Sequence, residues 1–494
     1  MNNRLTLLIG VLCLAAHDSE ASIQGQISAP TTGSAVQRGV LLSEQTTDLT
    51  LGDAVYLGLR NNRSIRSAYL QRVAQKFDLR VAEDAFSPQL TLNSEYRHDY
   101  GSSDRLKSAT LSPTASLLSE FGTQLSMAWT QQHQSAEQAG RYRSDGLDLS
   151  IIQPLLRGAG RDVTTAPVRL ARLNEQANRL NLKADVSNTI SEIIMSYREL
   201  LRSQEQLSIA DQALERARDL LEVNRALISA GRMAEFEVVQ AEADIAGQEL
   251  QVEEARNQRD IDRLSLLRLL ALDLSTPIHA SEALHIAPAL IDRHDALRLA
   301  QSQQPEYLST LLGSQQVDLN LLVAKNQGLW DVSLVGGVKQ TRDRYQTDHS
   351  SSSGRQWDSY AGVQLKIPIG DLSSRQAYIQ AQVAVENQAL ALEEARQTLE
   401  QSVNSVVRDL QVRWRQYEIA QRASELAKRK LAIEREKLQV GRSSNFQVIS
   451  FEGDLRHAEN SLLNARIAYL NAQTQLDRTL GMTLHSWDIA LNDF

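Results

Sequence analysis

AGRMAEFEVVQAEADI, residues 230–245, recurs with changes as VGRSSNFQVISFEGDL, residues 440–455, at an offset of 210 positions. Both copies hold a Gly-Arg pair, at Gly231 and Gly441, and a phenylalanine five positions after the glycine. Glycine suits a sharp helix end because it adopts positive φ at little cost. Each copy interrupts a long polar segment that is otherwise typical of helix, so the two stretches are predicted to be the turns of two helical hairpins.

The segments that lead into these turns are predicted to be very long helices. Neither glycine nor proline occurs over 168–230 or 371–440, which corresponds to about 95 and 105 Å at the usual rise per residue. Apolar residues before the first turn recur every seven positions, at Val186, Ile193, Leu200, Leu207, Leu214, Leu221 and Ile228. After the second turn the same spacing recurs at Leu455, Leu462, Tyr469 and Leu476. Such a repeat predicts coiled-coil packing, since an isolated amphipathic helix has nothing on which to bury its apolar stripe.

The duplication extends beyond the turns. DAVYLGLRNNRSIRSAYL, which begins at Asp53, aligns with DALRLAQSQQPEYLSTLL, which begins at Asp295, at an offset of 242. Each half is therefore predicted to contain a short helix pair, a β-like segment, a long helix, a Gly-Arg turn and a returning helix. The offset falls from 242 to 210, so the first half carries 32 additional residues, of which 28 lie between Pro88 and Pro154. An extra hairpin or a long loop is predicted there.

Between the short and the long helices, apolar residues alternate with polar ones, as in amphipathic strands. Strand-like runs begin at Leu90 (LTLNSEY), Thr123 (TQLSMAW), Leu147 (LDLSII), Asp331 (DVSLVGGV) and Tyr360 (YAGVQLKI). The polar stretches GSSDRLKS (101–108) and QTRDRYQTDHSSSSGRQ (340–356) are interpreted as exposed loops. Such strands fit a sandwich or a barrel shared between chains, and a barrel leaves no unpaired edge.

Composition favours a helical, secreted protein. Aromatic residues make up only 5% of the chain, and the net charge of −8 comes with no basic block that would indicate nucleic-acid binding. Residues 1–21 are predicted to be a secretory signal peptide, with a short buried helix as the alternative. The only cysteine, Cys13, falls inside it, so the mature chain is expected to lack disulfides and cysteine nucleophiles. Elsewhere no run approaches the roughly 20 apolar residues of a spanning helix, so a membrane crossing would require strands.

These features predict the organisation of the chain. We expect a signal peptide (1–21), an extended segment (22–48), a first structural repeat (49–276), a linker (277–293), a second structural repeat (294–487) and a C-terminal tail (488–494). Strands are expected at about 89–154 in the first repeat and about 331–368 in the second. The turns are expected at 230–236 and 440–446.

A signal peptide followed by a duplicated unit with Gly-containing hairpin turns resembles the TolC-like outer-membrane efflux proteins, also called outer membrane factors. The resemblance covers about 49–487, and LTLGDAV (49–55) and IIQPLLRGAGRD (151–162) are similar to phrases of that family. The duplication with its element order is the specific part of the match. It implies a mainly α protein with membrane β-strands, in which tandem-duplicated helical hairpins form a periplasmic coiled-coil tunnel.

The strands of such a protein belong to one outer-membrane β-barrel shared by a homotrimer. Members of the family typically lend four strands per chain, twelve in all. The additional residues of the first half therefore imply either a larger barrel or a hairpin that projects outside the membrane.

The resemblance implies a conduit and not an enzyme. Such a channel passes substrates from an inner-membrane transporter and a periplasmic adaptor to the exterior, in a tripartite efflux or type I secretion system. The implied location is the outer membrane of a Gram-negative bacterium, with a large periplasmic portion. No cofactor or metal is expected, because the nine histidines show no ligand-like spacing and no phosphate loop or GxSxG motif occurs.

The resemblance places the two turns at the periplasmic mouth of the tunnel, where they close the entrance and receive the adaptor. The residues that match are Gly231, Arg232, Phe236, Gly441, Arg442 and Phe446. Two interpretations of the arginines are open. Either each side chain satisfies the last carbonyls of its helix, or each is exposed and binds carbonyls or carboxylates of the adaptor.

The resemblance also implies acidic residues just past the turn, which ring the entrance and favour cations. This chain has Glu237 in the first copy, but Gln447 at the matching position of the second copy and Ser450 one helical turn further on. A strong cation-binding ring is therefore not expected. Gating through polar contacts among these three residues is a hypothesis, and ordinary solvated positions are its alternative.

Two other classes of protein compete with a conduit. A periplasmic adaptor carries one long helical hairpin between split β-domains and would not show the full duplication. A structural coiled coil of the cell envelope would lack both the alternating strands and the paired turns.

Overall fold

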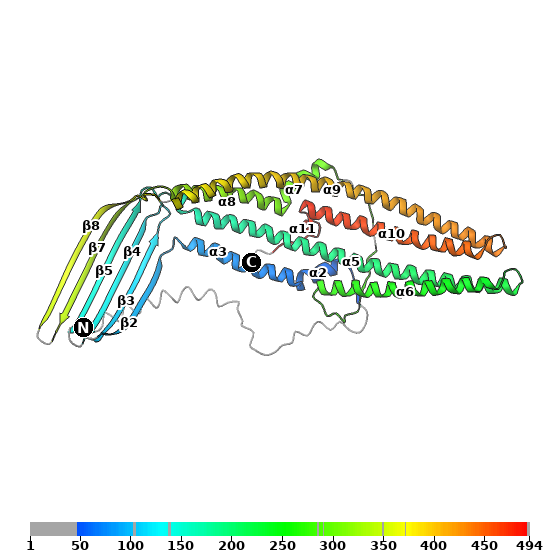
Figure 1. The fold of residues 1–494 in the computed structure, drawn as a ribbon, viewed down its shortest axis with the longest axis horizontal. Helices are drawn as coiled ribbons and strands as arrows, with labels where there is room; N and C mark the ends of the chain where they lie inside the picture. Colours follow the sequence, from blue (N-terminus) through cyan, green and yellow to red (C-terminus); the bar gives the residue numbers. More distant parts are fainter. Residues whose placement is uncertain are drawn as a thin grey trace.

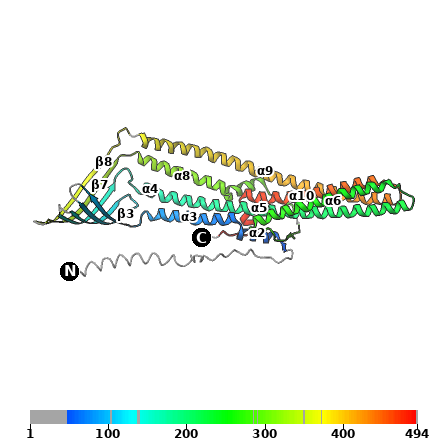
Figure 2. The ribbon, with the colours of Figure 1, turned by 60° about the horizontal axis from the view of Figure 1, so that its bottom comes forward.

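The computed structural model describes residues 47–101, 105–136, 140–283, 286–289, 291–347, 350–370 and 372–491. Figures 1 and 2 show an elongated molecule with a β-sheet at one end and two helical hairpin turns at the other. The predicted signal peptide (1–21) lies outside the described residues, as does the predicted extended segment up to residue 46.

Two repeats with the same order of helices build the molecule, which confirms the tandem duplication. Helices α2 and α7 begin 242 residues apart, and so do α3 and α8. The first repeat contains β1 (Thr47–Leu49), α2 (Leu51–Asn61), α3 (Arg63–Asp84), β2 (Gln89–Tyr100), β3 (Arg105–Leu118), β4 (Gln124–Ala136), β5 (Gly140–Pro154), α4 (Arg161–Thr164), α5 (Ala166–Ser229) and α6 (Phe236–Leu269). The second contains β6 (Ile278–Ala280), α7 (Arg293–Gln303), α8 (Pro305–Gln327), β7 (Asp331–Gln346), β8 (Ser351–Lys366), α9 (Leu372–Gln439), α10 (Asn445–Leu480) and α11 (Thr483–Ser486).

The two long helices predicted from the sequence are confirmed, since α5 has 64 residues and α9 has 68. Val186, Ile193 and Leu200 of the α5 heptad stripe are fully buried. Leu221 and Ile228, closer to the turn, are only half-buried. The stripe therefore packs most tightly midway along the molecule. In the part of the chain that the structure describes, no helix combines the length and the apolar character needed to cross a membrane.

One apolar core lies in the middle of each repeat. Ile190 and Leu266 are fully buried where α2, α5 and α6 meet the parallel pair β1–β6. Val403 and Tyr469 lie in the second core, which α7, α9 and α10 enclose. A buried arginine of α5, Arg198, connects the repeats by donating to carbonyl and hydroxyl oxygens of α10, and burial lowers its pKa to about 10.

The sheet has six antiparallel strands in the order β2-β3-β4-β5-β7-β8. The first repeat supplies four of them and the second supplies two, and the β5–β7 ladder joins the repeats. The additional residues of the first repeat therefore form strands of the same sheet and not a long loop. β2 and β8 are the two edges.

Two loop predictions are wrong. β3 already begins at Arg105, inside the stretch interpreted as a loop at 101–108. β7 continues to Gln346 and β8 begins at Ser351, so most of 340–356 is paired. The ladder bonds come from the backbone, so pairing continues past the apolar part of a strand, where side-chain alternation gives no signal. β3 was absent from the predicted runs because Pro113, which has no N–H to donate, interrupts its pattern.

Candidate functional site

The two hairpin turns end their first helices in the same way. We call residues 230–236 the first tip and residues 440–446 the second tip. Gly231 and Gly441 have φ of 68° and 73°. In the first tip, the N–H groups of Gly231 and Arg232 donate to the carbonyls of Ile228 and Leu227, both at 2.9 Å. This double bond pattern is the Schellman motif, which requires a left-handed residue at the glycine position.

The second tip repeats this motif. The N–H groups of Gly441 and Arg442 donate to the carbonyls of Leu438 and Lys437, at 3.0 and 2.8 Å. In both tips the backbone N–H of the arginine satisfies a terminal carbonyl, whereas no side-chain bond from Arg232 or Arg442 occurs within the described residues. The interpretation that these side chains cap the helices is therefore wrong.

Both tips expose the same pair of side-chain types at the end of the molecule. Arg232 and Arg442 are exposed. Phe236 and Phe446 are 69% and 65% exposed. A phenylalanine ring at this exposure is uncommon on a surface that meets only water, so each tip presents a cation beside an apolar group.

The tips differ in how the returning helix begins. In the second tip, Ser444 is the N-cap of α10, and its hydroxyl accepts from the N–H of Gln447 at 3.2 Å. The position 210 residues earlier is Ala234, and the described start of α6 has no side-chain cap. In the second tip, Ser443 also donates to Glu434 at 2.6 Å, and this bond together with the Lys437 ammonium lowers the pKa of the Glu434 carboxyl.

The three predicted entrance residues all lie at or just behind the tips. Glu237 and Gln447 are half-buried in the first turns of α6 and α10, and Ser450 is exposed. In the described part of the single chain, no hydrogen bond joins their side chains. The backbone carbonyl of Glu237 accepts from the Asn445 amide at 3.3 Å.

A buried amide pair joins the two hairpins directly behind the tips. Asn224 of α5 donates from Nδ2 to Oδ1 of Asn445 in α10, at 2.9 Å. Both side chains are fully buried. Since a buried amide is costly unless it is paired, this contact fixes the first tip against the second.

Each hairpin also carries two ion pairs that the duplication has copied. Arg225–Glu242 in the first hairpin corresponds, 210 residues on, to Arg435–Glu452 in the second. Arg218–Glu249 likewise corresponds to Lys428–Glu459. The glutamates of the first hairpin are 53% and 54% exposed, whereas Glu452 and Glu459 are 10% and 12% exposed.

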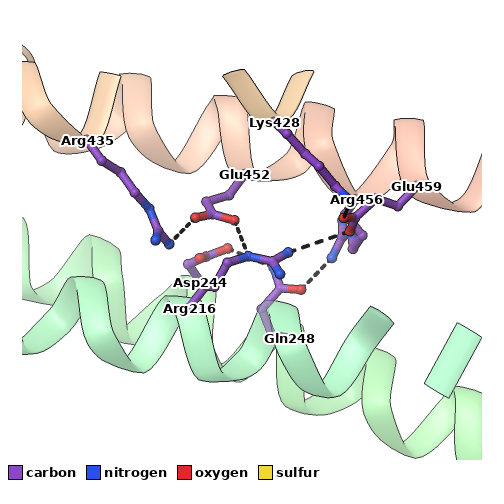
Figure 3. Close-up of polar contacts among 8 residues, drawn as sticks. All are labelled: Arg216, Asp244, Gln248, Lys428, Arg435, Glu452, Arg456 and Glu459. Atoms are coloured by element: carbon purple, nitrogen blue, oxygen red, sulfur yellow. Dashed lines mark hydrogen bonds and ion pairs between the residues drawn. The ribbon is translucent and has the colours of Figure 1, made fainter. Parts of the chain in front are cut away.

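The second-hairpin glutamates are buried because the first hairpin packs on them (Figure 3). Arg216 of α5 donates from Nε to Oε2 of Glu452 at 2.8 Å, on the opposite side from Arg435. Its Nη2 lies 4.0 Å from Oε2 of Glu459. Glu452 is therefore held between two guanidinium groups, one from each hairpin, and charge-assisted bonds of this kind are the stronger class.

A second contact crosses between the hairpins in the opposite sense. Arg456 of α10 donates from Nη1 to Oε1 of Gln248 in α6 at 2.5 Å, and Gln248 donates to Asp244 at 3.1 Å. We call the eight residues of Figure 3 the inter-hairpin cluster: Arg216, Asp244, Gln248, Lys428, Arg435, Glu452, Arg456 and Glu459. It joins four helices just behind the tips.

The sequence pattern marked Glu242 and Glu452 as equivalent, but it did not indicate the inter-hairpin cluster. Extending the 210-residue offset along the helices would have found the copied pairs, because Arg225 and Arg435 also match. The crossing residues have no such signal. Arg216 corresponds to Leu426 and Arg456 to Ala246.

The model of one protein family matches this chain. That family is described as "Outer membrane efflux protein", and the match covers residues 54–272 and 299–482, which is most of both repeats. Among curated proteins, none matches.

Solved structures with the same fold are outer membrane channels. The CmeC channel of Campylobacter jejuni is 16% identical, with a TM-score of 0.67, 88% of this chain covered and 86% of that one. VceC of Vibrio cholerae is 16% identical, with a TM-score of 0.66 and coverage of 87% and 96%. The open-state MtrE channel of Neisseria gonorrhoeae is 17% identical, with a TM-score of 0.66 and coverage of 88% and 89%. Likeness at this identity establishes the fold alone.

Proposed function

The chain belongs to the outer membrane efflux protein family, and from this premise we propose that it forms the outer-membrane conduit of a tripartite efflux or type I secretion system. It acts as a homotrimer in a Gram-negative bacterium, with its strands in the outer membrane and its long helices in the periplasm. One observation carries the proposal: the family match spans both repeats of a molecule whose sheet and tips lie at opposite ends.

The tips are the surfaces that meet a periplasmic adaptor, which connects the conduit to an inner-membrane transporter. Their exposed side chains support this assignment. Arg232 and Arg442 offer guanidinium donors that suit carbonyl and carboxylate partners. Phe236 and Phe446 offer apolar anchors next to them. Gly231 and Gly441 shape both turns, so a trimer presents six tips of similar chemistry.

Glu237, Gln447 and Ser450 belong to the entrance of the tunnel in this proposal. Only one of the three is ionisable, so the entrance has a weaker preference for cations than a full carboxylate ring would have. We expect the single-channel conductance in a planar bilayer to change when Glu237→Gln is introduced. Unchanged conductance and ion selectivity would remove these residues from the entrance.

The two competing classes of protein do not fit a family match over both repeats. An adaptor has one long helical hairpin, whereas this chain has α5–α6 and α9–α10. Extraction separates the remaining possibilities. A heat-modifiable trimer in detergent-solubilised outer membranes supports the conduit, and recovery as a soluble periplasmic protein rejects it.

The tip assignment predicts that reversing both arginine charges disconnects the adaptor. We expect the double variant Arg232→Glu, Arg442→Glu to lose at least about tenfold in adaptor binding, because a carboxylate would face the acceptor groups of the partner. The measurement is the amount of adaptor that co-purifies with the tagged channel after crosslinking in cells, together with export.

Trimer assembly should be unchanged in this variant, because the Schellman bonds of both tips come from the backbone. The matched control is Arg396→Glu, at an exposed arginine of α9 far from the tip. Normal adaptor recovery and export by the double variant would contradict the assignment.

A further inference from the structure

The sheet carries two chemically different faces across all six strands. Residues opposite each other in the ladders lie on the same face, so the printed register defines rows that cross the whole sheet. One such row is Leu90, Ala115, Met127, Leu149, Val338 and Ser359. The next row, on the other face, is Thr91, Thr114, Ala128, Asp148, Lys339 and Asp358. The first face is apolar and the second is polar from β2 to β8.

The apolar face is open in the single chain. Leu90, Met127 and Val338 are 62%, 47% and 40% exposed, although they lie on three different parts of the sheet. Exposed apolar surface of this extent is not stable against water, whereas strands that are apolar outside and polar inside are the pattern of a membrane wall. The additional strands share this pattern with the others.

The extra strands cannot be separated from this wall. The β2–β3 ladder pairs every residue from Gln89 to Tyr100, beginning at the end of the sheet next to the helices. A hairpin that projected beyond the membrane would have to leave the sheet, yet β3 is also paired with β4 along its length. The two strands beyond the four expected from the resemblance are therefore part of the same surface.

The sheet has two unpaired edges of compatible direction. β2 leaves the helical end of the sheet and β8 returns to it, so the two edges would be antiparallel if copies of the chain stood side by side. With the helical ends aligned, Gln89 faces Lys366, Leu92 faces Val363 and Arg97 faces Asp358. This alignment keeps both apolar rows and opposite charges together across the junction.

We propose that all six strands of each chain line the pore, and that β2 of one copy pairs with β8 of the next. This inference rests on the proposed trimer, since three copies of a six-stranded sheet close a ring of eighteen strands. Barrel diameter grows roughly in proportion to strand number, so this pore is about 1.5 times as wide as one built from four strands per chain, and barrels of this size hold an aqueous channel. The sheet end therefore does not limit cargo size, and the tip end does.

Adjacent cysteines on β2 test whether the extra strands belong to the wall. Cys13 is the only cysteine of the chain, so single introduced thiols are readily identified. Leu92→Cys lies on the apolar face and Asn93→Cys on the polar face. In whole cells, an impermeant maleimide should label Asn93→Cys at least about tenfold faster than Leu92→Cys, because only the pore side meets water.

The matched pair Leu149→Cys and Ser150→Cys, on the central strand β5, separates two kinds of failure. Equal labelling of the β2 pair with unequal labelling of the β5 pair overturns the inference and leaves the conduit standing. Equal labelling of both pairs overturns the conduit as well.

A crosslink tests the pairing of the edges. Asn93 and Gly362 face each other in the aligned register, and both are exposed in the single chain. In the double variant Asn93→Cys, Gly362→Cys, oxidation should give a covalent trimer on a non-reducing gel, and neither single variant should do so. Shifted partners for Asn93→Cys, namely Tyr360→Cys and Gln364→Cys, cover neighbouring registers. Absence of a crosslink in all three pairs, while the native trimer persists, overturns the inference.

Discussion

The hairpins α5–α6 and α9–α10 are copies of one unit, yet they are stabilised differently. Both hold the same two ion pairs at an offset of 210 residues. In the first hairpin these pairs are exposed. In the second they are buried under Arg216, which the first hairpin contributes. The difference shows that duplication copies the bonds within a hairpin, whereas packing of one copy on the other decides which set is shielded from water.

The contacts between the hairpins come from positions where the copies differ. Arg216 corresponds to Leu426, which is 66% exposed, and Arg456 corresponds to Ala246. Identical hairpins could not make this set of contacts. The asymmetry therefore gives the second hairpin a shielded interface and leaves the first hairpin with a more open outer surface.

The largest expected effect is at Glu452, which the comparison singles out. Glu452→Ala leaves two guanidinium groups without their shared partner and should reduce the local stability behind the tips by about 2–4 kcal/mol. Glu242→Ala, at the equivalent exposed position, should cost less than about 1 kcal/mol. Hydrogen exchange of the first turns of α10 and α6 measures both. Equal losses in the two variants would mean that burial does not distinguish the hairpins.

The next effect is at the distal ends of the returning helices, where the repeats again differ. Gly481 has φ of 72°, and a Cβ there would lie 2.4 Å from the Gln303 carbonyl oxygen, so Gly481→Ala should cost about 2–3 kcal/mol.

The position that ends α6 in the first repeat is Ala271, which adopts a φ of 52°. Ala271→Gly should stabilise that end by up to about 1 kcal/mol, because glycine reaches positive φ without a Cβ clash. Thermal denaturation of the purified trimer checks the opposite signs. A loss of stability in both variants would show that Ala271 is not strained.

The smallest effect concerns the starts of the returning helices. Ser444→Ala removes the cap of α10 and should cost about 1 kcal/mol, whereas Ala234→Ser supplies the missing cap of α6 and should gain up to about 1 kcal/mol. Hydrogen exchange at Gln447 and at Glu237 measures the two changes. If Ala234→Ser gives no added protection, the first tip is uncapped for a reason other than its side chain.

Much of the fold could be predicted from local pattern. The heptad stripe and the absence of glycine and proline predicted α5 and α9 closely, because helix formation depends on neighbouring residues. The family resemblance also predicted an outer-membrane efflux protein, and the match over both repeats confirms it. Strand lengths and β3 were less accessible, since ladder bonds extend through polar residues that do not alternate.

The sequence by itself determined the duplication, the long helices and the two Gly-Arg turns, because each depends on residues that are close along the chain. Only the tertiary structure decided which copies of the ion pairs are buried and how many strands share one sheet. Arg216 and Glu452 are 236 residues apart, and their contact depends on which hairpin surfaces meet. Leu149 and Val338 likewise share a face only because β5 pairs with β7. Contacts of this kind are properties of the assembled fold and leave no period in the sequence.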